Sequence, residues 1–321
     1  MELASLASLK RQRVNVSKFI LNNGALIFFF LMLILNSIFT PNFLNINTFW
    51  NLIIQSSTVI LVAMGMTFVI SSGGIDISVG TIMAIAGMIT ARLLPDFGAV
   101  PALLVSMFVG IIIGLFSGSI ISIFNIQPII VTLGVMISGR GIAKIIGDGN
   151  ILPIRDSNFS NIAMARFAGI PVQLFYVIVI CAVFLFIAKK TVFARYIEAM
   201  GDNFNASVLA GVKVKKMIIC IYMLSGFMAA IAGLLTIARA GASDPDTVGL
   251  SAELNAIAAV AIGDTPMSGG KARIIGTLVG ALIMQLITIT FNMNDIPYDW
   301  SLVTKTVIII LAVYIQNIKG N

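Results

Sequence analysis

The stretch SSGGIDISVGT, Ser71–Thr81, interrupts membrane-like sequence with three glycines and one aspartate. The apolar run VILVAMGMTFVI (59–70) precedes it and IMAIAGMI (82–89) follows it. A glycine weakens a helix by about 1 kcal/mol relative to alanine, and a carboxylate in a membrane is costly unless it faces protein or water. The stretch therefore predicts a break between two membrane helices. Asp76 has two possible roles: it caps the next helix at a tight turn, or it faces a translocation path.

The composition is that of a polytopic membrane protein. The 321 residues are 59% hydrophobic and 10% charged, whereas a soluble domain is about 25% charged. No polar stretch is long enough for a separate soluble domain, so we expect one domain. The absence of histidine excludes His-based catalysis and His metal sites. The net charge of +7 is interpreted as cytoplasmic basic residues rather than as a nucleic-acid signal.

Runs of about 20 apolar residues predict an all-α fold of about ten transmembrane helices. The predicted spans are 19–39, 52–72, 80–95, 100–125, 128–147, 171–189, 217–238, 249–264, 274–292 and 300–317. Residues 1–18 are expected to form a cytoplasmic N-terminal segment, and 19–318 the transmembrane domain.

The basic residues predict that both termini are cytoplasmic. With that orientation, 13 of the 20 lysines and arginines lie on the cytoplasmic side, most of them in the N-terminal segment and the loop 190–216. The other seven lie on the outer side or at outer helix ends: Arg92, Arg140, Lys144, Arg155, Arg166, Arg239 and Lys305.

One pattern, SGG-x5-GT, occurs twice, at 72–81 and at 268–277. Transporters are often built from internal repeats that meet at the binding site. Six predicted helices separate the copies, so a true repeat would be parallel. The alternative is coincidence in a chain with 28 glycines. The glycines predicted at helix breaks are Gly73, Gly74, Gly80, Gly269 and Gly270.

A second glycine pattern predicts close helix packing. Gly110, Gly114 and Gly118 form GxxxGxxxG, and Gly276 and Gly280 form GxxxG. Small residues at this spacing let helix backbones approach. We infer a compact bundle from them and no function.

Polar residues inside apolar runs are candidates for a substrate path. They are Asp76, Ser78, Gln127, Thr132, Glu253 and Asn255. Each can hydrogen-bond a hydroxylated solute, and each can equally bond a neighbouring helix. Arg140 and Lys144, one turn apart, could reach the surface or grip an acidic docking partner.

The basic loop 189–216 predicts two short helices separated by Gly201, Asp202 and Asn203. Asn203 would cap the second helix and Gly211 would end it. The loop is either a solvated charged connection or a rigid helix offered to a cytoplasmic partner.

No stretch of the sequence matches the phosphate-binding pattern GxxxxGK[ST]; the nearest, MSGGKAR (267–273), lacks the first glycine and the final Ser or Thr. If ATP drives this protein, another chain binds it. We therefore expect no enzymatic activity, cofactor or metal in this chain.

Four blocks resemble a known family: VAMGMTFVISSGGIDISVG, IQPIIVTLGVMISGRG, FARYIEAMGDNFNASVLAGVKV and ELNAIAAVAIGDTPMSGGKARIIGTLVGALI. Together they are similar to the membrane permease of ribose-type ABC sugar importers, within the branched-chain permease superfamily. Galactofuranose permeases look most similar. The resemblance covers about residues 50 to 315.

The resemblance implies a subunit of a bacterial inner-membrane importer for a monosaccharide. Its partners would be a cytoplasmic ABC ATPase, a periplasmic or lipid-anchored sugar-binding protein and a second copy or related permease, all within membrane lipid. It also implies a coupling element that touches the ATPase, with contact candidates Arg195, Glu198, Gly201, Asn203, Ala206 and Gly211.

Two departures from the family pattern fall in one loop. Where the family usually has IGGT, this chain has Ile262-Gly263-Asp264-Thr265, and Lys271-Ala272 follow its SGG. The extra carboxylate could change contacts on the cytoplasmic side.

Two other functions remain open on the residues alone. In an ion-coupled secondary sugar transporter, Asp76 and Glu253 would be the ion sites. A structural membrane subunit would not explain polar groups in several helices. Charged residues in the outer loops are predicted to dock a binding protein: Asp148, Arg155, Asp156, Arg166, Asp244 and Asp246.

Overall fold

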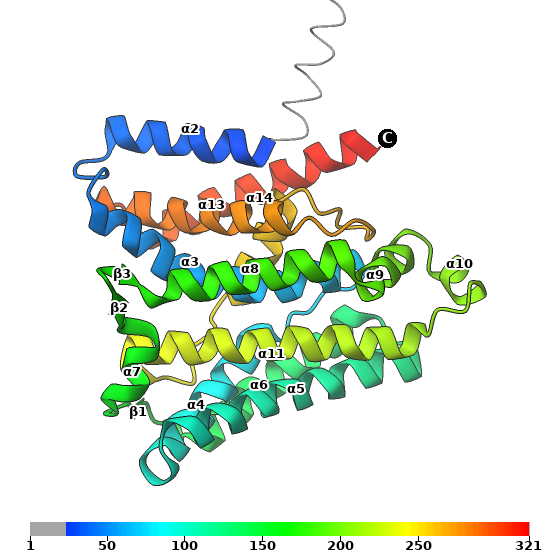
Figure 1. Cartoon of the computed structure of the whole chain (residues 1–321), viewed down its shortest axis with the longest axis horizontal. Coiled ribbons are helices and arrows are strands. Elements are labelled where there is room, and N and C mark those ends of the chain that lie inside the picture. Colours follow the sequence, from blue (N-terminus) through cyan, green and yellow to red (C-terminus); the bar gives the residue numbers. More distant parts are fainter. Residues whose placement is uncertain (1–23, 321) are drawn as a thin grey trace, which may run out of the picture.

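The computed structural model describes residues 24–320, which form a bundle of long helices lying roughly side by side (Figure 1). The predicted segment 1–18 and the start of the first predicted span lie outside the described residues. The longer helices are α2 (Gly24–Phe39), α3 (Ile46–Ser71), α4 (Val79–Phe97), α5 (Ala99–Phe124), α6 (Pro128–Ile146), α8 (Val172–Lys190), α11 (Val214–Ala240), α13 (Ile274–Met293) and α14 (Tyr298–Gly320). The short helices are α7 (Ser157–Met164), α9 (Val192–Asp202), α10 (Phe204–Leu209) and α12 (Ala252–Ile262).

Within residues 24–320, seven helices are long and apolar enough to cross a membrane: α3, α4, α5, α6, α8, α11 and α13. The spans predicted in those ranges are confirmed as helices of this kind. The range 249–264 differs, because α12 has only 11 residues. At 1.5 Å per residue it is about 16 Å long, roughly half the hydrocarbon core. The total of about ten crossings stays a prediction.

The predicted close packing is confirmed. Gly110 of α5 lies against the backbone of Gly226 in α11, and Gly114 lies against that of Tyr222. A side chain at either glycine would collide with α11. Gly276 and Gly280 of α13 approach α12 in the same way. These contacts join α5 to α11 and α12 to α13 at backbone distance.

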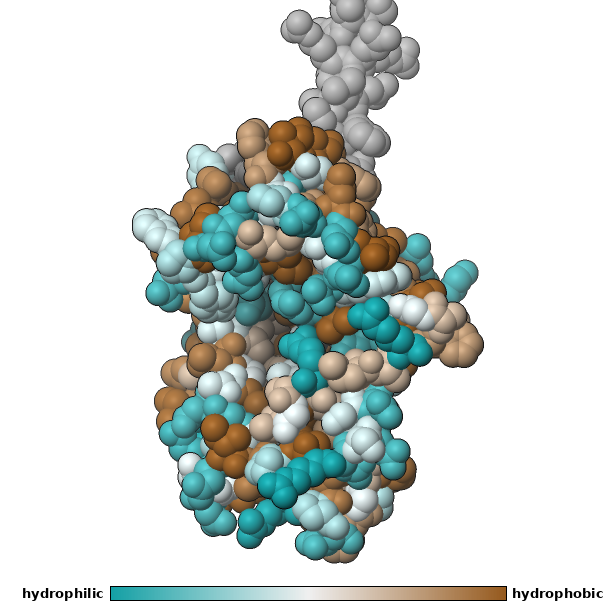
Figure 2. Space-filling model, turned by 90° about the vertical axis from the view of Figure 1, so that its left-hand side faces the viewer, coloured by the Kyte–Doolittle hydropathy of each residue, from teal (hydrophilic) through white to brown (hydrophobic). Residues whose placement is uncertain are grey.

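The two ends of the bundle differ. At one end α9 and α10 project beyond the long helices (Figure 1). The other end carries α7 and four two-residue strands, β1 (Leu152–Pro153), β2 (Arg166–Phe167), β3 (Ile170–Pro171) and β4 (Ala242–Ser243). Strand β1 pairs antiparallel with β4, and β2 with β3. Figure 2 shows hydrophilic residues over much of this end, with apolar patches between them.

Candidate functional site

Residues 72–78 form a partly buried, non-helical connection between α3 and α4, as the glycines predict. Gly73 has φ +85°, a conformation that side chains rarely adopt. Gly74 is required for space, because a Cβ there would lie 2.8 Å from the Tyr222 hydroxyl. Gly80 corrects the prediction: it lies inside the first turn of α4, not at the break, and packs against Gly249.

Asp76 is 1% exposed and has both carboxylate oxygens engaged inside the protein. Oδ1 accepts hydrogen bonds from the Ser78 amide at 3.0 Å and the Ser78 hydroxyl at 2.6 Å. Oδ2 accepts one from the Ser225 hydroxyl of α11 at 2.7 Å. Asp76 therefore closes the turn onto Ser78, the N-cap residue of α4, and ties the break to α11. Contact between Asp76 and a solute stays a prediction.

The carbonyl of Ile75 accepts hydrogen bonds from side chains of α11 and α6. The Tyr222 hydroxyl of α11 and the Thr132 hydroxyl of α6 both lie 3.4 Å from this oxygen. Unpaired backbone groups are costly in a membrane, so these donors allow the chain to leave the helical path there. Thr132 is thus buried beside the break, whereas Gln127 is exposed before the first turn of α6.

The second copy of the SGG pattern lies beside the first. The Gly270 amide donates to the Ser71 carbonyl at 2.8 Å, and the Thr67 and Thr277 hydroxyls are 2.9 Å apart. Gly269 and Gly270 have φ of +100° and +97° in the loop 263–273, outside any helix as predicted. The end of α3 and the loop after α12 are therefore one contact region.

Helix α9 ends in this contact region. Gly201 lies against the Ser71 carbonyl and the backbone of Gly269 and Gly270, with no room for a side chain. One turn earlier, Glu198 Oε1 accepts from the Ala272 amide at 3.0 Å. Two of the predicted coupling residues thus face the chain's own loop.

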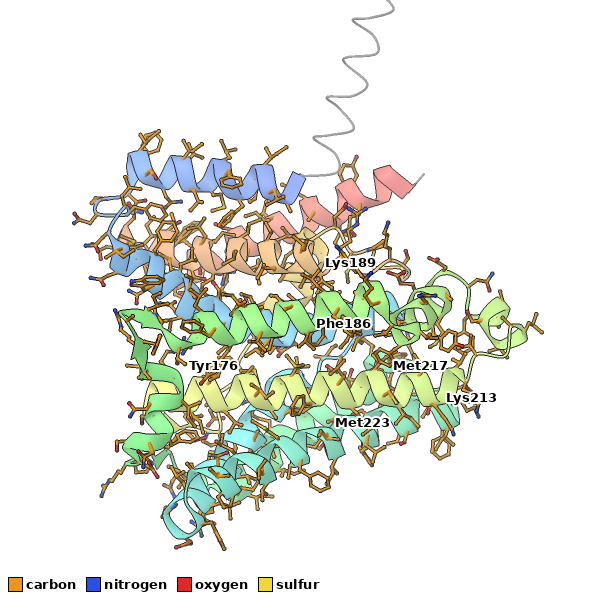
Figure 3. The ribbon with its side chains drawn as sticks, in the orientation of Figure 1. Tyr176, Phe186, Lys189, Lys213, Met217 and Met223 are labelled. Carbon is orange, nitrogen blue, oxygen red and sulfur yellow. The ribbon has the colours of Figure 1, made fainter. Side chains whose placement is uncertain are left out.

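The rest of the predicted coupling element has the expected form. Asn203 Oδ1 accepts from the Ala206 amide at 2.9 Å, which confirms the cap of α10. Gly211, with φ +81°, follows the end of α10 as predicted. Arg195, Asn203, Ala206 and Gly211 are exposed. Figure 3 labels Lys189 and Lys213 at this same end of the bundle.

Arg140 and Lys144 both contact the chain's own segment before α12, and Lys144 is also exposed. Contact of either residue with a docking partner stays a prediction. Arg140 Nη1 donates to the carbonyls of Pro245 and Val248 at 2.7 and 2.8 Å. Lys144 Nζ lies 2.7 Å from Asp246. These contacts fasten the segment that leads into α12.

Glu253 lies in the first turn of α12, half-buried, where its carboxylate touches Gly80 of α4. Asn255, two residues after Glu253, faces α14. Lys305 Nζ lies 3.4 Å from the side-chain oxygen of Asn255. Lys305 is 6% exposed. The side of the membrane on which Lys305 lies stays a prediction, and nothing in the sequence indicated its contact with Asn255.

The chain belongs to the family described as "Branched-chain amino acid transport system / permease component", whose model matches residues 48–313. The chain is similar to the ribose import permease protein RbsC of Haemophilus influenzae, with 35% identity over 95% of this chain and 96% of the relative. It is also similar to the galactofuranose transporter permease protein YtfT of Escherichia coli, with 33% identity over 89% and 87%. The fructose import permease protein FruF of Bifidobacterium longum is 33% identical over 92% and 89%. These matches confirm the resemblance to ribose-type sugar permeases.

No solved structure matches the chain. Within residues 24–320 no three potential ligands among His, Cys, Asp and Glu are grouped to hold a metal ion.

Proposed function

We propose that this chain is the permease subunit of an ATP-driven importer that moves a monosaccharide into the cytoplasm. The observation that carries this is the match of 95% of the chain to a ribose import permease. Other relatives are named for galactofuranose, fructose and allose, which supports the class of monosaccharides and no single sugar.

The proposed arrangement has about ten helices in a bacterial inner membrane, with both termini in the cytoplasm. The partners are a cytoplasmic ABC ATPase, a sugar-binding protein outside and a second permease subunit. ATP hydrolysis belongs to the ATPase, because this sequence has no phosphate-binding loop.

The contacts of α9 support a coupling mechanism. Because Gly201 lies against Ser71 and Gly270, movement of α9 shifts the end of α3 and the loop before α13 together. The end of α3 is connected to Asp76 and α11 through the break, and the loop before α13 is connected to α12. An ATPase that binds α9 and α10 differently in the inward-facing and outward-facing states would thereby change the conformation of the substrate path.

The ion-coupled alternative has less support. In that alternative Asp76 would bind an ion, yet Asp76 is buried and both of its oxygens accept hydrogen bonds from Ser78 and Ser225. Glu253 remains half-buried beside Gly80.

The test is ATPase activity of the reconstituted complex. Sugar-loaded binding protein should stimulate hydrolysis when this chain is present and not when it is omitted. Equal activity with and without this chain would contradict the proposal.

A further inference from the structure

A cavity of about 730 Å³ lies between α2, α8, α13 and α14, at the end of the bundle that carries α9. Apolar side chains line much of it, among them Phe28, Leu185, Val279 and Leu311. They come from four different helices, so the cavity is a gap between membrane helices. The proposed coupling mechanism makes no use of it.

Basic side chains line the same cavity. Lys189 follows the apolar part of α8, and Lys271 belongs to the loop after α12. Both are exposed, and neither lies within ion-pair distance of a carboxylate in the part of the chain that the structure describes. Two acidic residues also line the cavity, but Asp264 pairs with Arg273 at 2.9 Å and Glu198 binds the Ala272 amide.

Arg273 has a hydrogen-bond donor without an acceptor in the described part of the chain. Its Nη1 is used by Asp264, but its Nε is buried and has no acceptor among the described residues. Three basic side chains, Lys189, Lys271 and Arg273, thus line the cavity, against the two acidic ones. The cavity therefore combines an apolar interior with a cationic end.

We propose that this cavity binds one anionic phospholipid, with an acyl chain between α2 and α14 and the phosphate near Lys189 and Lys271. Basic pockets between transmembrane helices on the cytoplasmic side suit acidic headgroups. A small soluble anion would leave the apolar lining unused. The assignment to the cytoplasmic leaflet rests on the orientation proposed above, whereas the headgroup preference rests on the cavity alone.

The test is native mass spectrometry of the full chain in detergent, with phosphatidylglycerol or phosphatidylcholine of equal chain length added. We expect one phosphatidylglycerol to be retained, in preference to phosphatidylcholine. The double variant Lys189→Gln, Lys271→Gln should bind it at least about tenfold more weakly, because both ammonium groups near the phosphate are removed. The matched control Lys190→Gln, Lys215→Gln changes two exposed lysines that do not line the cavity and should bind as the wild type does.

A second variant tests the apolar part. Ala312→Phe fills the cavity from α14 and should lower retention of phosphatidylglycerol, while Ala182→Phe, exposed on α8, should not. Equal retention of the two lipids, or unchanged binding by the double variant, would overturn the proposal. So would disulfide formation in the double variant Phe19→Cys, Ala312→Cys, because the chain's own N-terminal residues would then occupy the cavity. Binding is measured without partners or transport, so failure here is distinct from failure of the proposed function.

Discussion

Asp76 and Ser225 join the break between α3 and α4 to the middle of α11, through a 2.7 Å hydrogen bond between residues 149 positions apart. The bond makes the carboxylate part of the protein's framework. The two possible roles of Asp76 can be distinguished by experiment, because a framework residue and a solute ligand respond differently to substitution.

Replacing Asp76 with Ala should destabilise the protein. The change removes the acceptor of three hydrogen bonds and leaves the two serine hydroxyls without it, which costs about 2 kcal/mol or more. Asp76→Asn keeps an acceptor oxygen and should cost less. Thermal unfolding in detergent measures both, and uptake per folded molecule should stay near normal in Asp76→Asn. If Asp76→Ala left stability unchanged and raised the KM for sugar, Asp76 would be a solute contact instead.

Gly201→Ala should uncouple ATP hydrolysis from transport. The added Cβ meets the backbone of Ser71 and Gly270, which cannot yield as a flexible side chain would. Uptake in proteoliposomes should fall while hydrolysis by the complex continues. Gly141→Ala is the matched control, since nothing lies within 4 Å of that position. Normal uptake by Gly201→Ala would show that this contact is not needed for coupling.

Gly211 should respond differently from Gly201. No atom lies near its missing Cβ, and only its φ of +81° restricts substitution. Gly211→Asn, which tolerates the left-handed region, should therefore retain coupling, whereas Gly211→Val should not. The same uptake and hydrolysis assays measure the coupling in both variants. Equal loss in both variants would mean that contact with a partner, and not backbone conformation, requires glycine.

Asp264 has a φ of +64°, in the left-handed region that side chains rarely adopt. Both Asp264→Gly and Asp264→Ala remove the ion pair with Arg273, so comparing them isolates the backbone. Asp264→Gly should be more stable by about 1 kcal/mol, because a Cβ is unfavourable in the left-handed region. Thermal unfolding of the two variants measures the difference. Equal stability would contradict strain at this position.

Arg140→Lys should loosen the segment before α12. The lysine side chain is one atom shorter, so its ammonium does not reach the position from which Nη1 donates to both the Pro245 and Val248 carbonyls. Amides in 244–251 should therefore exchange faster with deuterium. Lys144→Gln removes only an ion pair between two exposed side chains and should change exchange little. Equal deuterium exchange of 244–251 in the two variants would show that Arg140 does not hold this segment in place.

The proposed docking of a binding protein now centres on Arg155 and Arg166, which are exposed. Asp156 caps α7 by accepting from the Asn158 and Phe159 amides, so reversing its charge would also damage the helix. Arg155→Glu should weaken docking in a salt-dependent way, and Asp156→Asn, which keeps a capping oxygen, is the control. Unchanged affinity of Arg155→Glu at low salt would remove this docking site.

The sequence predicted what depends on neighbouring residues. Hydropathy located the long helices because crossing a bilayer requires length, and the glycines at 73 and 74 located the break. Contacts between residues far apart in the chain could not be predicted from the sequence. Nothing in the order of residues pairs Asp76 with Ser225, or indicates that Lys305 turns toward Asn255, because each depends on which helix faces lie together.

The most direct test of the proposed importer is sugar uptake into vesicles that contain this chain, its ATPase and its binding protein. Uptake is compared with ATP and no ion gradient, and with an ion gradient and no ATP. We predict uptake with ATP alone. Uptake with the gradient alone would contradict the account and make Asp76 and Glu253 candidates for ion sites.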